Sequence, residues 1–87
     1  MSDRAEMNGP TSSGVLVAGT RAQVHDLTPI QYSPVIRRAM VDRCRRLGRG
    51  HFARAKAADS NADAEAHQAD GRAWMREAKR WDLKGTL

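Results

Sequence analysis

The sequence predicts a small, mainly α-helical domain built on a helical hairpin, preceded by an N-terminal extended arm or a short β-hairpin. Three observations carry this prediction. Apolar residues recur at steps of three and four in two stretches, about residues 34–58 and 61–82, as on the buried face of a helix. A residue type that caps helices precedes each stretch. The turn between them is short, which makes the two helices antiparallel neighbours.

The N-terminal part of the chain contains little that can form a core. Residues 1–14 combine Gly, Pro, Ser and Thr with few apolar side chains, which indicates a flexible arm. Residues 15–87 are then expected to form a single small domain. Within residues 14–27, β-branched residues before Gly19 and an alternation that includes Val24 indicate one or two short strands. The alternative is an extended segment that adds to the sheet edge of a partner.

The first predicted helix begins at a Ser-Pro pair. Ser33 supplies an oxygen that accepts an exposed backbone N–H, and Pro34 is favourable where no N–H is needed. The pair Thr28-Pro29 has the same form, but the helical pattern starts after the second pair. Gly48 and Gly50 each cost about 1 kcal/mol relative to Ala in a helix, so we expect a break or bend there. The apolar stripe consists of Ile36, Met40, Cys44, Leu47 and His51.

The second predicted helix begins after the turn over residues 59–61, where Ser60 or Asn61 can cap it. Its first turns hold acidic residues and its last turns basic ones, which are the signs that the helix dipole favours. Trp74 and Trp81 lie seven residues apart on one face and supply most of its large apolar area. We predict that they pack against the first helix as core. The alternative is an interface anchor for a partner or a second copy of the chain, since a thin hairpin covers two indoles poorly.

Positive charge is concentrated in one segment of the chain. The net charge is +5, but residues 35–58 hold eight basic groups against Asp42 alone, which gives +7. The flanking segments 1–34 and 59–87 each sum to −1. At 100° per residue, five basic side chains of this segment gather along one side of the helix, away from the apolar stripe. We call them the arginine face: Arg38, Arg45, Arg46, Arg49 and Lys56.

The arginine face favours a binding function. A guanidinium group presents a planar fork to carboxylate or phosphate oxygens, so we expect docking on a larger protein or nucleoprotein complex. With Trp74 and Trp81 as a second surface, the chain would be an adaptor, an assembly subunit or an inhibitor, of a size often made by phages and mobile elements. The alternative is contact with a nucleic-acid backbone without strong sequence preference, because only Phe52 could stack on a base. A solvated helix face without a ligand is the third reading.

The residue inventory argues against catalysis and bound cofactors. Acidic pairs lie only near the solvated start of the second helix, and no glycine-rich phosphate loop is present, so we expect no enzyme activity and no catalytic residue. Cys44, His51 and His67 match no metal-ligand spacing, so we expect neither a metal site nor a cofactor. The chain has one cysteine, no signal-peptide pattern and no run approaching about 20 apolar residues. We therefore expect a cytoplasmic protein without membrane contact.

Overall fold

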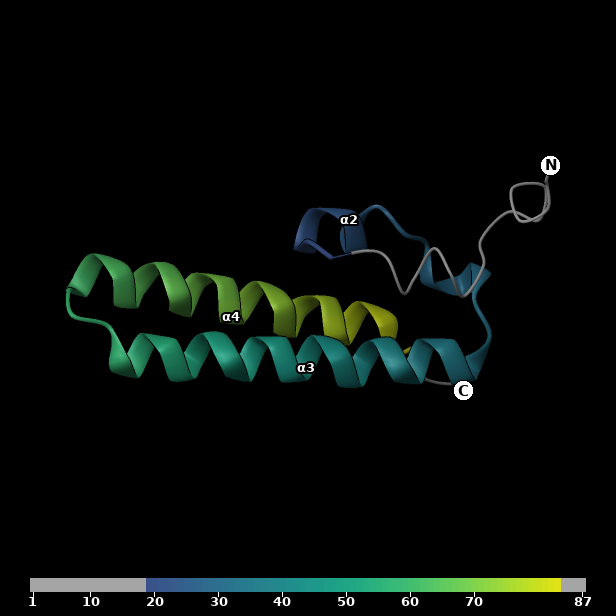
Figure 1. Ribbon diagram of the computed structural model, residues 1–87. Coiled ribbons are helices and arrows are strands. Elements are labelled where there is room, and N and C mark those ends of the chain that lie inside the picture. The colour runs from purple at the N-terminus through teal and green to yellow at the C-terminus, as the bar shows by residue number, and fades with distance from the viewer. Residues whose placement is uncertain (1–18, 84–87) are drawn as a thin grey trace, which may run out of the picture.

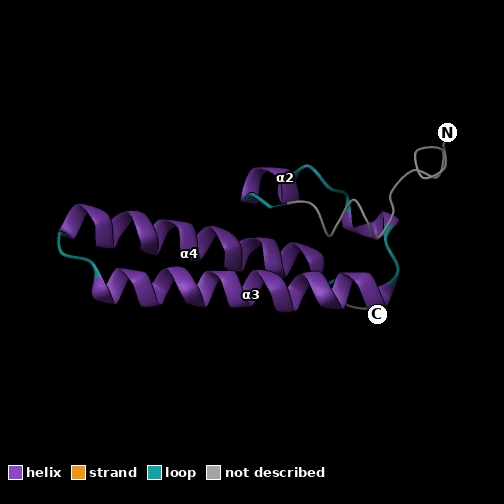
Figure 2. Cartoon of the chain, in the orientation of Figure 1, coloured by secondary structure: helices purple, strands orange, loops and turns teal. Residues whose placement is uncertain are grey.

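The computed structural model describes residues 19–83, which contain three α-helices and one turn of 3₁₀ helix. In chain order they are α2 (Arg21–His25), the 3₁₀ turn η2 (Pro29–Gln31), α3 (Pro34–Ala57) and α4 (Asn61–Trp81). α3 and α4 lie side by side and antiparallel, and α2 packs against the C-terminal half of α4 (Figure 1). The described residues form only helices and loops (Figure 2). The predicted helical hairpin is confirmed.

Both helices of the hairpin begin at the predicted caps. The Ser33 hydroxyl oxygen accepts the backbone N–H of Ile36 at 3.3 Å, ahead of α3. The Ser60 hydroxyl oxygen accepts the backbone N–H of Asp63 at 3.1 Å, ahead of α4. Only residues 58–60 connect the two helices, so α4 returns directly along α3.

α3 continues without interruption through Gly48 and Gly50, so, contrary to expectation, the helix is not broken there. Gly48 is buried against α4, where a Cβ atom would lie 2.9 Å from Met75 Cε and 3.1 Å from the carbonyl oxygen of Gly71. Glycine therefore lets the two helices approach closely at this point. The packing of α3 on α4 offsets the helix-propensity cost of the two glycines. This packing cannot be seen in the sequence of α3 alone.

The same substitution is expected to have different effects at Gly50 and Gly71. A Cβ at Gly50 meets no atom within 4 Å, so Gly50→Ala should raise the free energy of unfolding by about 0.5–1 kcal/mol through helix propensity. A Cβ at Gly71 would lie 2.8–3.0 Å from ring carbons of Phe52, so this half-buried ring must move to admit it. The cost of that movement offsets the gain in helix propensity, so Gly71→Ala should stabilise the fold less than Gly50→Ala. Urea unfolding measures both effects, and equal stabilisation by the two variants would contradict the close packing at Gly71.

The chain before η2 is helical where short strands were expected. Residues 21–25 form α2, which corrects the strand prediction for residues 19–27; residues 1–18, with the expected arm, lie outside the described residues. Gln23 donates its backbone N–H to the Thr20 hydroxyl at 3.0 Å, and its side-chain oxygen accepts the Thr20 N–H at 2.9 Å. This reciprocal capping box starts a helix of five residues, which is too short for an apolar period to show.

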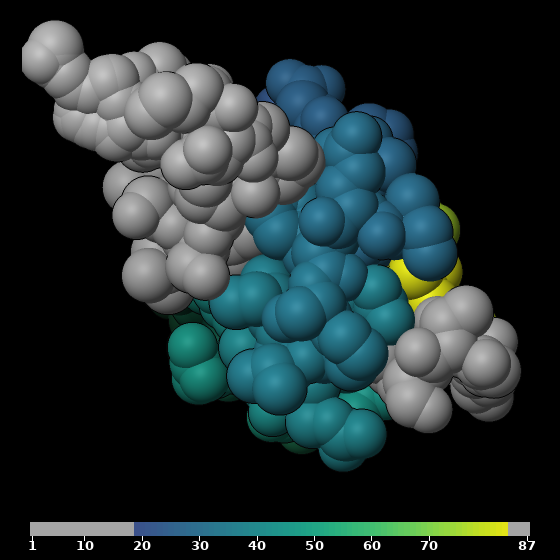
Figure 3. Space-filling view, turned by 90° about the vertical axis from the view of Figure 1, so that its right-hand side faces the viewer, coloured from purple at the N-terminus to yellow at the C-terminus, as the bar shows by residue number. Residues whose placement is uncertain are grey.

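The hydrophobic core lies in the half of the hairpin where α3 begins and α4 ends. The ring of Tyr32 lies 5.5 Å from the ring of Trp81, centroid to centroid. Seen from this end, the described surface is formed mainly by the segment before α3 and the first turns of α3, with the end of α4 at its edge (Figure 3). The segment from α2 to Tyr32 thus covers the indole of Trp81, which α3 and α4 alone would leave exposed. The buried cluster comprises Val24, Tyr32, Met40, Val41, Cys44, Trp74, Ala78 and Trp81.

A polar network joins α2 to the end of α4. The guanidinium group of Arg80 donates to three backbone oxygens, at 3.0 Å to Val24, 3.2 Å to His25 and 2.9 Å to Leu27. These carbonyls lie at the C-terminal end of α2, where a helix lacks internal donors. Arg80 Nη2 also lies 2.7 Å from Glu77 Oε1, and the other oxygen of Glu77 lies 2.5 Å from His25 Nδ1. Glu77 is 4% exposed, so these two partners compensate a buried carboxylate.

Candidate functional site

All five side chains of the arginine face lie on α3 and are exposed. Arg38, Arg45 and Arg49 are separated by seven and four residues, which places them on one side of the helix. Lys56 continues this side into the last turn of α3. Because α3 is continuous through its glycines, the basic side chains extend along most of one helix.

Within residues 19–83, the five side chains of the arginine face make no ion pair and no hydrogen bond. Two other arginines of α3 belong to the fold instead. Arg37 is 4% exposed and its Nη1 donates to the backbone oxygen of Tyr32. Arg43 is half-buried and interacts within the protein. The fold thus separates arginines that face the protein from arginines that face solvent.

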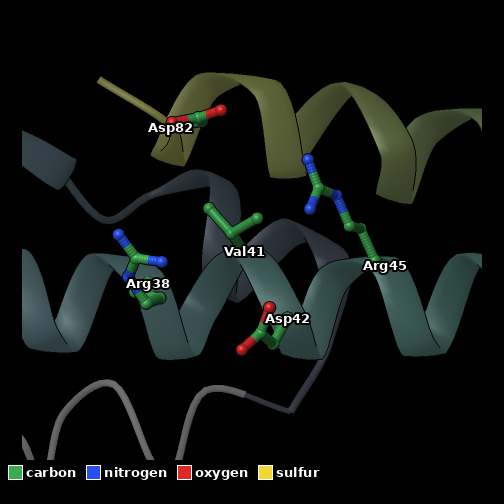
Figure 4. Close-up of a pocket in the computed structure, with 5 residues that line it drawn as sticks. All are labelled: Arg38, Val41, Asp42, Arg45 and Asp82. Atoms are coloured by element: carbon green, nitrogen blue, oxygen red, sulfur yellow. The ribbon is translucent and has the colours of Figure 1, made fainter. Parts of the chain in front are cut away.

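Arg38 and Arg45 line a shallow hollow beside the end of α4. In Figure 4 their guanidinium groups lie on either side of Val41, and Asp82 lies across from them at the end of α4. Asp42 completes the lining from α3. The hollow measures about 110 Å³, well below the roughly 300–1,000 Å³ of small-molecule sites. Its two carboxylates give the surface mixed charge.

An exposed apolar side chain lies near the first arginine of the face. Val35 is 78% exposed and precedes Arg38 by one helical turn. Arginine beside apolar surface is common in protein–protein interfaces. Val35 could have been recognised in the sequence, because it stands outside the apolar stripe.

Trp74 and Trp81 lie in the core, 5% and 0% exposed. Their predicted packing partners Met40 and Leu47 are in or against the same cluster. Neither indole offers surface to a partner in this fold, and the reason given for self-association through this face, two uncovered indoles, does not apply. Tyr32, which was not among the predicted core residues, helps to cover Trp81.

Cys44 is fully buried, and its thiol is a packing group. Burial, together with the negative charge of Glu77, raises the pKa of the thiol to about 11, so the group is protonated at neutral pH and a poor nucleophile. Cys44 was one of the three residues considered, together with His51 and His67, as metal ligands. The structure instead brings His51 and His67 together with Asp70.

Comparison of the chain with protein-family models, curated proteins and solved structures finds no match. Among residues 19–83, no helix combines the length and the apolar character needed to cross a lipid bilayer.

Proposed function

We propose that the protein is a non-catalytic binding module that docks on an acidic surface of a larger protein or nucleoprotein complex through the arginine face of α3. It would act as an adaptor, an assembly subunit or an inhibitor. The observation that carries the proposal is the set of five exposed basic side chains on one helix that have no ionic partner within residues 19–83.

The energetics of arginine support a docking role. Guanidinium groups form charge-assisted, often bidentate hydrogen bonds with carboxylates, which are about twice as strong as neutral ones. Because none of the five side chains is paired with an acceptor among the described residues, binding a partner breaks no ion pair of the fold there. The core packs on another side of α3, through Met40 and Cys44, so binding and folding use different side chains of one helix.

The composition around the face favours a protein partner over a bare nucleic-acid backbone. Val35 adds exposed apolar area, which a protein surface can bury and phosphate groups cannot. Asp42 is exposed on α3, and Asp82 lies at the edge of the same hollow. Both carboxylates repel a continuous line of phosphates, whereas a protein surface can present cations to them.

Direct binding to a nucleic-acid backbone is the second candidate. The net charge of +7 over residues 35–58 supports it, because neutralising phosphates releases counterions whatever the base sequence. Such binding weakens steeply as the salt concentration rises.

The test is capture from an extract of the source organism with three immobilised proteins. One is the wild type and one is Arg45→Ala/Arg49→Ala, which shortens two side chains of the arginine face. The third is Arg72→Ala/Arg76→Ala, a matched control that removes the same charge from two exposed positions of α4. Each capture is run with and without nuclease.

We expect the wild type and the α4 control to retain the same proteins after nuclease treatment and the Arg45→Ala/Arg49→Ala variant to lose them. Capture that disappears with nuclease in the wild type supports the nucleic-acid candidate instead. Identical protein capture by all three baits overturns the assignment of the arginine face as the docking surface.

A further inference from the structure

We propose that His51, His67 and Asp70 form a binding site for a divalent transition-metal ion of the zinc type, placed between α3 and α4 on the side of the core nearer the connecting loop. The site is independent of the arginine face and replaces the expectation that the chain has no metal ligands. Within residues 19–83, these three side chains are a group of potential metal ligands whose ligand atoms lie close together.

The distances between the ligand atoms suit a metal ion. The Nδ1 atoms of His51 and His67 lie 3.2 Å apart, one from each helix. Two nitrogens bound to zinc at about 2.0–2.1 Å with tetrahedral angles lie about 3.3 Å apart. The carboxylate oxygen of Asp70 lies 4.0 Å from His51 Nδ1, so it needs to approach that nitrogen by less than about 1 Å to reach the spacing of two zinc ligands. All three ligand atoms lie within 4.8 Å of one another.

The burial of the three side chains differs in a way that suits metal entry. The side chain of His51 is 19% exposed, so packing limits the orientation of its ring. The side chain of Asp70 is 58% exposed and is free to change rotamer as an ion arrives. The ring centroids of His51 and His67 lie 5.5 Å apart with an interplanar angle of 33°, so the rings are not stacked and their Nδ1 atoms face one another.

The chemistry of the ligand set points to zinc or a neighbouring transition metal. Imidazole nitrogen suits Zn²⁺, Cu²⁺ and Ni²⁺, whereas Mg²⁺ and Ca²⁺ prefer oxygen ligands alone. Two imidazoles and one carboxylate provide three protein ligands and leave a fourth tetrahedral position for water. The two Nδ1 atoms lie within hydrogen-bonding distance of each other. To bind the ion through both Nδ1 atoms, each neutral ring must carry its hydrogen on Nε2, so a hydrogen on Nδ1 in the metal-free protein moves to Nε2 of the same ring.

The position of the site gives a bound ion a mechanical role. The large core residues lie in the other half of the hairpin, and no residue of α4 before Gly71 is buried. In this region α3 contributes Ala55 as a buried residue, and its small side chain provides little apolar area. A metal ion bound by His51 from α3 and by His67 and Asp70 from α4 would therefore link the two helices and stabilise the half of the hairpin that has the least apolar packing.

The experiment uses untagged, chelator-treated full-length protein and Zn²⁺ as the probe. Calorimetric titration should show one ion per chain. Thermal unfolding should shift upward by roughly 10 °C at a Zn²⁺ concentration about 100 times Kd, because the ion binds only the folded chain. Hydrogen exchange should slow mainly in the loop half of α3 and α4. Co²⁺ should give the intense visible absorption of a tetrahedral site with nitrogen ligands.

Four variants separate this site from general attraction of cations. His51→Gln and His67→Gln should each weaken Zn²⁺ binding by more than about tenfold and abolish the Co²⁺ absorption. Asp70→Asn, at an exposed position, should weaken binding without a loss of metal-free stability. Glu65→Gln removes the same charge from another side of α4 and should leave the affinity unchanged. Absence of saturable binding, or equal affinity in both histidine variants and the wild type, overturns the proposal.

Discussion

Trp81→Ala is expected to destabilise the fold more than any other single substitution at the described residues. The indole is 0% exposed, packs against Tyr32 and belongs to the one cluster that joins all three helices. Truncating a buried tryptophan to alanine costs about 3–5 kcal/mol. Since small domains are stable by only about 5–15 kcal/mol, the variant should lose a large fraction of its stability and unfold at a clearly lower urea concentration. Far-UV circular dichroism during urea unfolding measures the loss.

Two controls show whether burial is the cause of that loss. Val35→Ala truncates an apolar side chain that is 78% exposed, and its effect should stay within about 0.5 kcal/mol. Trp81→Phe keeps an aromatic ring beside Tyr32 and removes an indole N–H that has no acceptor within residues 19–83, so it should cost clearly less than alanine. A stable Trp81→Ala protein with native helix content would mean that the indole does not lie in the core.

Arg80→Ala is expected to have the second largest effect, about 2–4 kcal/mol, because it removes one partner of a buried carboxylate. Glu77 would keep only His25 as a side-chain partner, and the carbonyl oxygens of Val24, His25 and Leu27 would lose the donor that Arg80 supplies. The side chain of Arg80 is 30% exposed, which places the cost below that of a fully buried pair. We expect α2 to separate from α4, and the fluorescence of the tryptophans to shift toward that of solvated indole.

A double-mutant cycle tests the origin of the Arg80 effect. Glu77→Gln removes the buried charge, so Arg80→Ala should cost less in the Glu77→Gln background than in the wild type. Arg76→Ala, one turn earlier at an exposed position of α4, should change stability by less than about 0.5 kcal/mol. Strictly additive effects of the two substitutions would show that the pair does not hold α2 in place.

The hairpin could be predicted from the sequence because its determinants are local. Ser33 and Ser60 each cap a helix through a donor three residues away, and a three-residue connection fixes the antiparallel arrangement. The apolar spacing identified Met40, Cys44 and the two tryptophans as one buried face. Such signals act within one or two helical turns, and a sequence presents them directly.

The packing of α2 against α4 could not be predicted, because the residues in contact are distant in sequence. Arg80 donates to a carbonyl 56 positions earlier, and Glu77 pairs with a histidine 52 positions earlier. In the sequence, neither Arg80 nor Glu77 can be distinguished from a charged residue that is exposed to solvent on α4. The short helix α2 had a signal, the capping box of Thr20 and Gln23, but its single buried residue, Val24, also fits a strand. Tertiary packing decided between the two.

The candidate sites were predictable to different degrees. Helical periodicity alone placed Arg38, Arg45 and Arg49 on one side of α3, and the structure exposes all three. The approach of His51 and His67 depends on how α3 and α4 align along their length, which a ligand-spacing motif within one helix does not encode. Gly48 illustrates the same limit, since its effect depends on Gly71 of the opposite helix.

The proposed binding through the arginine face leaves the core folded, and NMR of the arginine side chains distinguishes this face from the other surfaces. The ¹⁵N-labelled protein is titrated with the partner that survives nuclease treatment, and the Nε–Hε signals are followed. Signals of Arg38, Arg45 and Arg49 should shift or broaden while those of Arg72 and Arg76 on α4 stay in place. Changes confined to the α4 arginines would mean that the partner docks elsewhere.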